Sequence, residues 1–217
     1  KDSQADLYIT ADAGRLGAFQ EKGMFQRINS KILKNAIPSN FRSPYWYGIA
    51  KRARVIYYTP SRTNPPKNLS YEDLSDLKYK GKVVIRKSNN IYNQSLVASL
   101  IANNGKKKTA EWAKGIVSNM ARKPKGNDRA QILAVAAGEA DYAIANTYYI
   151  ALMLSGKKGP EQQAAAKKVK PFFPNQEGRG THMNISGGGV LKHAPNKANA
   201  INLLEFLLTK EAQEHIV

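Results

Sequence analysis

The chain has 217 residues, of which 34 are lysine or arginine and 16 are aspartate or glutamate, giving a formal net charge of +18. This length allows one large domain or two small lobes with cores of their own. The absence of cysteine excludes disulfides, zinc fingers and cysteine nucleophiles. No apolar run reaches the roughly 20 residues that span a bilayer. The chain starts without a signal peptide, so we expect a mature, cut or intracellular form.

The strong positive charge is typical of nucleic-acid-binding proteins. Against that interpretation, the basic residues are scattered over many predicted elements. The sequence has no aromatic RNA-binding strand motif, zinc-finger spacing or helix-turn-helix pattern. We therefore expect no nucleic-acid partner, although steeply salt-dependent binding to DNA or RNA would support this rival interpretation.

Strands alternate with helices along the whole chain, which predicts α/β layers. The first part is expected to contain a strand at 6–10, a helix at 14–21, a strand at 52–58, a proline-rich crossing at 59–67 and a short helix at 69–77. The second part is expected to contain a strand at 82–86, helices at 91–102, 109–120 and 128–138, a strand at 141–145, a helix ending at 154, an exposed loop and helix at 157–170, a strand at 169–174 and helices at 195–209 and 210–217.

Two short patterns allow structural predictions of their own. Tyr57 and Tyr58 are adjacent within a predicted strand, so their side chains should lie on opposite faces and pack. The run Gly187–Gly189 matches no phosphate-loop spacing and more simply allows a backbone crossing at a hinge.

A second pair of adjacent tyrosines, Tyr148 and Tyr149, lies where the strand at 141–145 gives way to a helix. Asn146 and Thr147 supply N-cap chemistry. Two phenols in a first helical turn can converge on one atom, and the positive helix end should favour their phenolate form. Phenolates are hard oxygen donors suited to ferric iron. The alternative is that both rings simply pack, as tyrosines often do.

Tyr92 occupies the same local setting, in the first turn of the helix that Ser88–Asn90 are expected to cap. Tyr92, Tyr148 and Tyr149 therefore all lie at strand-to-helix junctions. In an open parallel sheet such junctions line one edge, where ligands bind. Three phenolates would neutralise one trivalent cation, so this set predicts a ferric-ion site.

With these residues in view, the chain resembles the periplasmic ferric-ion-binding proteins of ABC iron importers, especially the cyanobacterial type. The segments that carry the resemblance span nearly the whole chain: ADLYITADAGRL (5–16), KRARVIYY (51–58), SNNIYNQ (88–94), GNDRAQILAVAAGEAD (126–141), NTYY (146–149) and GTHMNISGGG (180–189). The resemblance implies an α/β, type II-like, two-lobed periplasmic binding protein with hinge-crossing strands and an inter-lobe cleft. The first lobe would comprise 1–56 and 181–217, and the second 57–180.

The resemblance also implies roles for individual residues. Tyr92, Tyr148 and Tyr149 match the tyrosines that ligate Fe(III) in the second lobe. Asn127 and Asn146 match positions that hold a synergistic anion in some relatives, so they are candidates to contact the ligands or an anion.

Other positions depart from the family pattern. Where some relatives have a first-lobe glutamate ligand, this chain has Ala11, with Asp12 beside it. His182 is a possible ligand, but we expect it to be structural. Relatives begin with a loop that carries a further tyrosine, often preceded by a histidine, and continue beyond the position of Val217. We therefore expect this chain to be truncated at both ends, with an incomplete first lobe.

The function that this resemblance implies is capture, not catalysis. The protein would be a periplasmic monomer that binds ferric iron, as the ion or as an anionic chelate such as citrate, and delivers it to an ABC transporter permease in the inner membrane. No serine-histidine-acid set, Walker loop or dinucleotide fingerprint indicates an enzyme. The alternative is a protein of the same fold whose cargo is an anion or a small organic solute held by helix N-termini.

Overall fold

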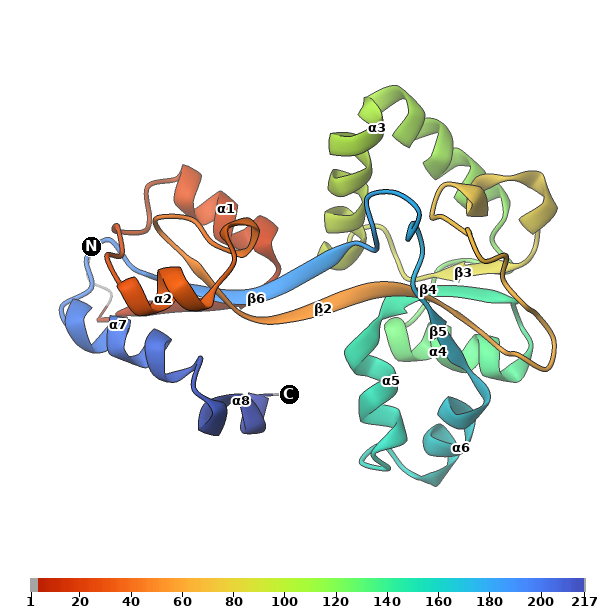
Figure 1. The fold of residues 1–217 in the computed structure, drawn as a ribbon. Coiled ribbons are helices and arrows are strands. Elements are labelled where there is room, and N and C mark those ends of the chain that lie inside the picture. The colour runs from red at the N-terminus through yellow and green to blue at the C-terminus, as the bar shows by residue number, and fades with distance from the viewer. Residues whose placement is uncertain (1–3, 217) are drawn as a thin grey trace. The chain divides into compact units, whose positions relative to one another are not determined.

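The computed structural model describes residues 4–216, and the chain forms two compact units. Unit 1 comprises Lys1–Lys51 and Asn184–Val217, and unit 2 comprises Arg52–Met183. The chain enters unit 2 within strand β2 and leaves it at the start of strand β6 (Figure 1). The division into functional lobes at 56/57 and 180/181 stays a prediction. Val217, the last residue of the predicted final helix, lies outside the described residues.

Unit 1 is a small layer of strands covered by short helices. Its elements are β1 (Leu7–Ala11), α1 (Ala13–Glu21), α2 (Lys31–Ala36), a 3-10 turn (Ser39–Phe41), the beginning of β2 (Tyr47–Tyr58), most of β6 (Met183–Val190), α7 (Lys197–Phe206) and α8 (Lys210–Ile216). Strand β1 pairs antiparallel with β6, with Leu7 opposite Val190. Tyr47 and Leu33 are buried in a core with Val190 and the apolar face of α7. The helices therefore pack on the strands through this apolar core and through a second, smaller apolar cluster around Leu16.

The glycine run of β6 is explained by close packing within unit 1. A Cβ atom added to Gly187 would lie 2.5 Å from the carbonyl oxygen of Tyr47, and one added to Gly189 would lie 2.6 Å from that of Tyr45. Real Cβ atoms do not approach a backbone oxygen so closely. Glycine at these positions therefore lets two backbone segments lie against each other.

Unit 2 contains the larger sheet, built from the second half of β2 and three further strands. Its other elements are β3 (Val83–Ile85), α3 (Ile91–Ser118), α4 (Asp128–Ala137), β4 (Tyr142–Asn146), α5 (Thr147–Leu154), α6 (Pro160–Lys168), β5 (Lys170–Phe172) and two 3-10 turns (Asp73–Ser75 and Leu77–Tyr79). Strand β4 is parallel to β3 and antiparallel to β2, and β5 pairs with β2. The sheet is therefore mixed, and its parallel pair is the part that carries α3 and α5.

Helices cover both faces of this sheet (Figure 1), as the alternation of strands and helices predicted. Helices α4, α5 and α6 pack on one face around Val55, Tyr57 and Ala143. Helix α3 and the 3-10 turns pack on the other face around Ile56 and Ile144. The period-2 alternation of β2 and β4 thus buries both faces of the sheet, which explains why these strands read as continuous apolar runs.

Helix α3 joins two helices that the sequence predicts separately, at 91–102 and 109–120. Gly105 interrupts it with φ 79° and ψ 164°, which is not helical. The predicted break is therefore present as a kink, at the residue type that adopts positive φ without strain. Among residues 4–216, no helix is long and apolar enough to cross a membrane.

Candidate functional site

The three tyrosines singled out from the sequence lie together in unit 2. Because β3 and β4 are adjacent and parallel, the helices that follow them, α3 and α5, begin at the same edge of the sheet. The hydroxyl of Tyr148 donates a hydrogen bond to the hydroxyl of Tyr92, with 3.3 Å between the oxygens. The rings of Tyr148 and Tyr149 stack, with centroids 4.2 Å apart and planes inclined by 30°. Three phenols from two helices thus form one cluster.

The phenol of Tyr148 holds its proton more firmly than an ordinary tyrosine. Burial raises its pKa well above the usual value of 10, and hydrogen bonds with Tyr149 and Tyr92 raise the pKa further. For Tyr148, the expectation that the helix N-terminus would favour the phenolate is therefore wrong in the protein without a cation. Desolvation and neighbouring hydroxyls outweigh the partial charge of the helix end.

Two arginines lie close to the ring of Tyr92. The guanidinium carbons of Arg52 and Arg86 are each 5.6 Å from the ring centroid. This distance allows cation–π attraction. The cluster therefore combines phenol oxygens with positive charge, an environment that favours anionic groups.

The asparagines near the tyrosines make different hydrogen bonds. Asn90 is the N-cap of α3, as predicted, and its side chain accepts a hydrogen bond from the Tyr92 N–H at 3.0 Å. Asn127 caps α4 in the same way, accepting from Ala130 at 3.2 Å. Asn146 begins α5, but its side chain does not cap that helix. The side-chain Oδ1 atom of Asn146 instead accepts a hydrogen bond from Arg54 at 2.8 Å.

A buried ionic network lies behind the tyrosines, and it was not predicted from the sequence. Arg54 forms a 2.9 Å ion pair with Asp128, and their side chains are 1% and 0% exposed. Arg86 reaches the other carboxylate oxygen of Asp128 at 3.3 Å. The sequence signal for this network is Arg54, which directly precedes the apolar run Val55–Tyr58 in the same predicted strand. A charged side chain in a buried strand requires a partner.

The remaining candidates, Asp12 and His182, make the following contacts. Asp12 is fully buried in unit 1, where its carboxylate caps α1 through the Gly14 N–H at 2.9 Å and accepts from Asn184. His182 contributes its backbone, whose carbonyl accepts from the Arg54 N–H at 3.0 Å. In the described part of the chain, no group of three or more histidine, aspartate or glutamate side chains could hold a metal ion. Tyrosine oxygens are therefore the donors that the described residues bring together.

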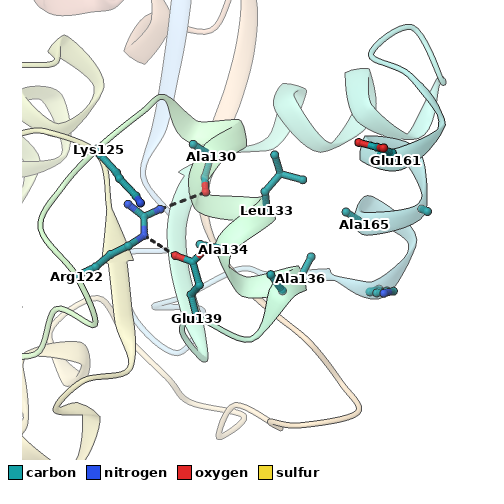
Figure 2. Close-up of a pocket in the computed structure, with 12 residues that line it drawn as sticks. Arg122, Lys125, Ala130, Leu133, Ala134, Ala136, Glu139, Glu161 and Ala165 are labelled. Atoms are coloured by element: carbon teal, nitrogen blue, oxygen red, sulfur yellow. Dashed lines mark hydrogen bonds and ion pairs between the residues drawn. The ribbon is translucent and has the colours of Figure 1, made fainter.

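A separate hollow lies between α4 and α6 (Figure 2). Half of its twelve lining residues are alanine, and Leu133 also lines it. Two further lining residues, Arg122 and Glu139, form an ion pair at 2.9 Å. None of the three tyrosines lines it. The hollow and the site predicted from the tyrosine pattern therefore lie in different places.

The model of the bacterial extracellular solute-binding protein family matches residues 2–217. The chain belongs to this family. It is 51% identical over 214 residues to iron uptake protein A1 of Synechocystis, covering 98% of this chain and 59% of that protein. It is 27% identical to the Fe(3+)-binding periplasmic protein of Serratia marcescens, covering 98% of this chain and 61% of that protein. The chain thus spans about three fifths of the length of these relatives.

Solved structures give the same picture. The Trichodesmium protein IdiA (FutA), in complex with iron and citrate ligands, has a TM-score of 0.93 and 56% sequence identity. The match covers 98% of this chain and 68% of that one. Apo FutA2 from Synechocystis has a TM-score of 0.92 and 46% identity, covering 99% of this chain and 69% of that one.

These relatives confirm several predictions made from the sequence. The resemblance to cyanobacterial ferric-binding proteins is correct, and so is the two-lobed binding-protein fold with α/β layers. The relatives are uptake and solute-binding proteins, which agrees with the prediction that the chain is not an enzyme. The names of these relatives describe binding of Fe(3+) and iron uptake.

Proposed function

We propose that this protein captures ferric iron in the periplasm through the phenolates of Tyr92, Tyr148 and Tyr149 and delivers it to an ABC transporter permease. The chain acts as a monomer in this proposal. The observation that carries it is the convergence of the three phenols, with the Tyr148 and Tyr92 oxygens 3.3 Å apart. The relatives named for iron uptake and for Fe(3+) binding support the same cargo.

The chemistry of capture is an exchange of protons for a metal ion. A free phenol has a pKa of about 10, and burial raises that of Tyr148 above this value. Iron must therefore displace protons from the cluster, so binding strengthens as the pH rises and weakens in acid. Three phenolates balance the charge of Fe(III) and leave an excess negative charge on Fe(II), which favours the oxidised ion.

The arginines beside Tyr92 favour an anion in the same place. Arg52 and Arg86 bring two positive charges to within 5.6 Å of the ring centroid. The amide nitrogen of Asn146 is buried and has no hydrogen-bond partner among the described residues. We keep Asn146 and Asn127 as candidates to hold an anion that accompanies the iron. These observations also favour the second candidate function, binding of a small organic anion without metal.

Charge is concentrated in the unit that holds the tyrosines. Unit 2 contains 23 of the 34 basic residues and 9 of the 16 acidic ones, a net charge of +14. Such a surface repels a bare cation and attracts an anionic chelate. We expect the association rate with ferric citrate to fall as ionic strength rises. A rate that does not depend on salt would contradict delivery as an anionic chelate.

The first experiment is a titration of the protein with ferric citrate, followed by its visible spectrum. A phenolate-to-iron charge-transfer band is expected, and Tyr148→Phe should weaken or shift it. The matched control is Tyr58→Phe, which removes a hydroxyl from a half-buried tyrosine elsewhere in unit 2.

Each outcome separates the two candidate functions. A band that responds to Tyr148→Phe and not to Tyr58→Phe supports ferric capture. Absence of a band, with calorimetric binding of citrate alone, would support an anion as the cargo. Because the chain spans about three fifths of its relatives, the titration is repeated on a longer form before the iron proposal is abandoned.

A further inference from the structure

One guanidinium contacts both helices that carry the tyrosines. The NH2 group of Arg54 donates to the side-chain oxygen of Asn93 at 2.6 Å, and Asn93 is the neighbour of Tyr92 in α3. The NH1 group donates to the side-chain oxygen of Asn146 at 2.8 Å, and Asn146 precedes the first turn of α5. The relative position of the two first turns is thus set through a single planar group.

Asp128 holds that guanidinium in place and adds a third helix to the arrangement. It is the first residue of α4, and its Oδ2 atom accepts from Arg54 at 2.9 Å and from the Asn146 N–H at 2.8 Å. Its Oδ1 atom faces Arg86 at 3.3 Å. The carboxylate therefore orients Arg54, anchors the start of α5 and holds the arginine that lies over the Tyr92 ring.

Further contacts fix the backbone of Arg54. Arg54 in β2 lies opposite Asn146 in β4 in the antiparallel pairing of these strands. Its carbonyl oxygen accepts a hydrogen bond from the Tyr71 hydroxyl, and its N–H donates to the His182 carbonyl at 3.0 Å. The side chain is 1% exposed, so water does not compete for these hydrogen bonds. A fork with this many fixed partners has little freedom to move.

We propose that Arg54 and Asp128 form a buried clamp that sets the geometry of the tyrosine cluster. Both are positioning residues, which act on the cargo through Tyr92 and Tyr148. This inference rests on the proposed function for its effect on iron, but the clamp itself concerns only the arrangement of α3 and α5. Lysine cannot replace Arg54, because a single ammonium cannot reproduce a planar fork that reaches Asn93 and Asn146 together.

The test is Arg54→Lys, which keeps the charge opposite Asp128 and removes the fork. The matched control is Arg122→Lys, because Arg122 also pairs with a carboxylate in unit 2, at 2.9 Å from Glu139, but lines the hollow away from the tyrosines. We expect Arg54→Lys to shift the ferric charge-transfer band and to lower the affinity for iron roughly 10–100-fold, the range for residues that orient metal ligands. The control should leave both unchanged.

A second variant and a second measurement keep the outcomes distinct. Asn93→Ser removes the link from Arg54 to α3, together with the hydrogen bonds that the Asn93 amide donates to the Arg86 and Lys87 carbonyls, and leaves the ion pair intact. It therefore serves if Arg54→Lys does not fold. Backbone amide chemical shifts of the iron-free protein, recorded for Tyr92 and Tyr148, follow the clamp without any metal. If neither this chain nor the longer form shows a ferric band, the proposed function fails, and the amide shifts still decide on the clamp. Wild-type band, affinity and amide shifts in both Arg54→Lys and Asn93→Ser would overturn the clamp.

Discussion

The chain contains two pairs of adjacent tyrosines, and unit 2 uses them in opposite ways. Tyr57 and Tyr58 lie in β2, where alternation sends their rings to the two faces of the sheet and into two different cores. Tyr148 and Tyr149 lie in the first turn of α5, where their rings stack with centroids 4.2 Å apart. Tyr57 is fully buried, whereas Tyr148 is 37% exposed.

This difference shows that the backbone, not the dipeptide, decides what two phenols can do. A strand separates neighbouring side chains by half a turn, so one metal ion cannot contact both. A helix start keeps neighbouring side chains within about 100° of each other and lies beside the dipole end of the helix. The same two residues are therefore packing groups in one place and a candidate ligand pair in the other.

The largest expected effect is on the α5 pair. Replacing both residues, Tyr148→Phe with Tyr149→Phe, removes two proposed ligands while keeping the rings. We expect complete loss of the ferric charge-transfer band and an affinity lowered by about 10⁴-fold, since even a residue that orients a ligand is worth 10–100-fold. Circular dichroism should report an unchanged fold. A double variant that still binds iron with the wild-type visible spectrum would contradict the proposal that Tyr148 and Tyr149 are ligands.

The next effect is on the stability of the β2 pair. Tyr57→Ala leaves a cavity among Val55, Ala143 and their neighbours, and we expect it to lower the free energy of unfolding by about 3–5 kcal/mol. Urea unfolding measures this loss. Iron affinity of the folded fraction should change little, because Tyr57 faces the core. A stable Tyr57→Ala protein would show that the core tolerates the cavity.

Alkaline pH sharpens the comparison through the Tyr57 hydroxyl. Tyr57→Phe loses one hydrogen bond, to the Asn146 carbonyl at 3.3 Å, and should cost about 1 kcal/mol at neutral pH. Burial raises the pKa of Tyr57 above the usual value of 10, so the wild-type folded state keeps a proton that the unfolded state loses. Stability from this group is full below pH 10 and declines as the pH rises above it.

The variant lacks that proton, so its deficit relative to wild type should shrink above pH 10. Denaturant unfolding at several alkaline pH values measures the difference. Tyr142, whose pKa burial raises to about 12, destabilises both proteins equally over the same window. A deficit that is constant with pH would contradict the role assigned to burial.

The smallest effect is expected for Tyr58→Phe. Its ring is half-buried against the core around Ile56 and Ile144. Among the described residues, its hydroxyl takes no part in the hydrogen-bond network of Arg54 and Asp128. We expect a change in unfolding free energy within about 0.5 kcal/mol and an unchanged ferric spectrum. A clear loss of iron in this variant would mean that the two pairs are not independent.

The sequence predicted the parts of the fold that depend on local pattern. Asn90 and Gly138 bound their helices where cap chemistry placed them, and the strand before Tyr148 follows from its apolar run. The α5 helix was predicted in its correct place because strand, cap and glycine stop agree. The order and direction of the strands in the mixed sheet could not be predicted, because local sequence pattern does not determine which strands pair.

The cluster and its support were predictable to different degrees. Equivalent positions at two strand-to-helix junctions were enough to bring Tyr92 and Tyr148 together. The clamp of Arg54 and Asp128 joins residues 74 positions apart in the chain, and no local signal pairs them. Asn146 was expected to cap α5, but its side chain turns to Arg54 because a buried guanidinium requires acceptors.

The glycines of β6 carry a consequence for sequence variation. At Gly187 and Gly189 the neighbouring backbone occupies the space of a Cβ atom, whereas nothing lies within 4 Å of such an atom at Gly17. If every amino acid were tried at each position and folded variants were selected, we expect glycine alone at positions 187 and 189. Many residue types should be accepted at position 17. The three-letter run GGG would then be a fingerprint by which distant homologues of unit 1 can be sought, even where every tyrosine has been replaced.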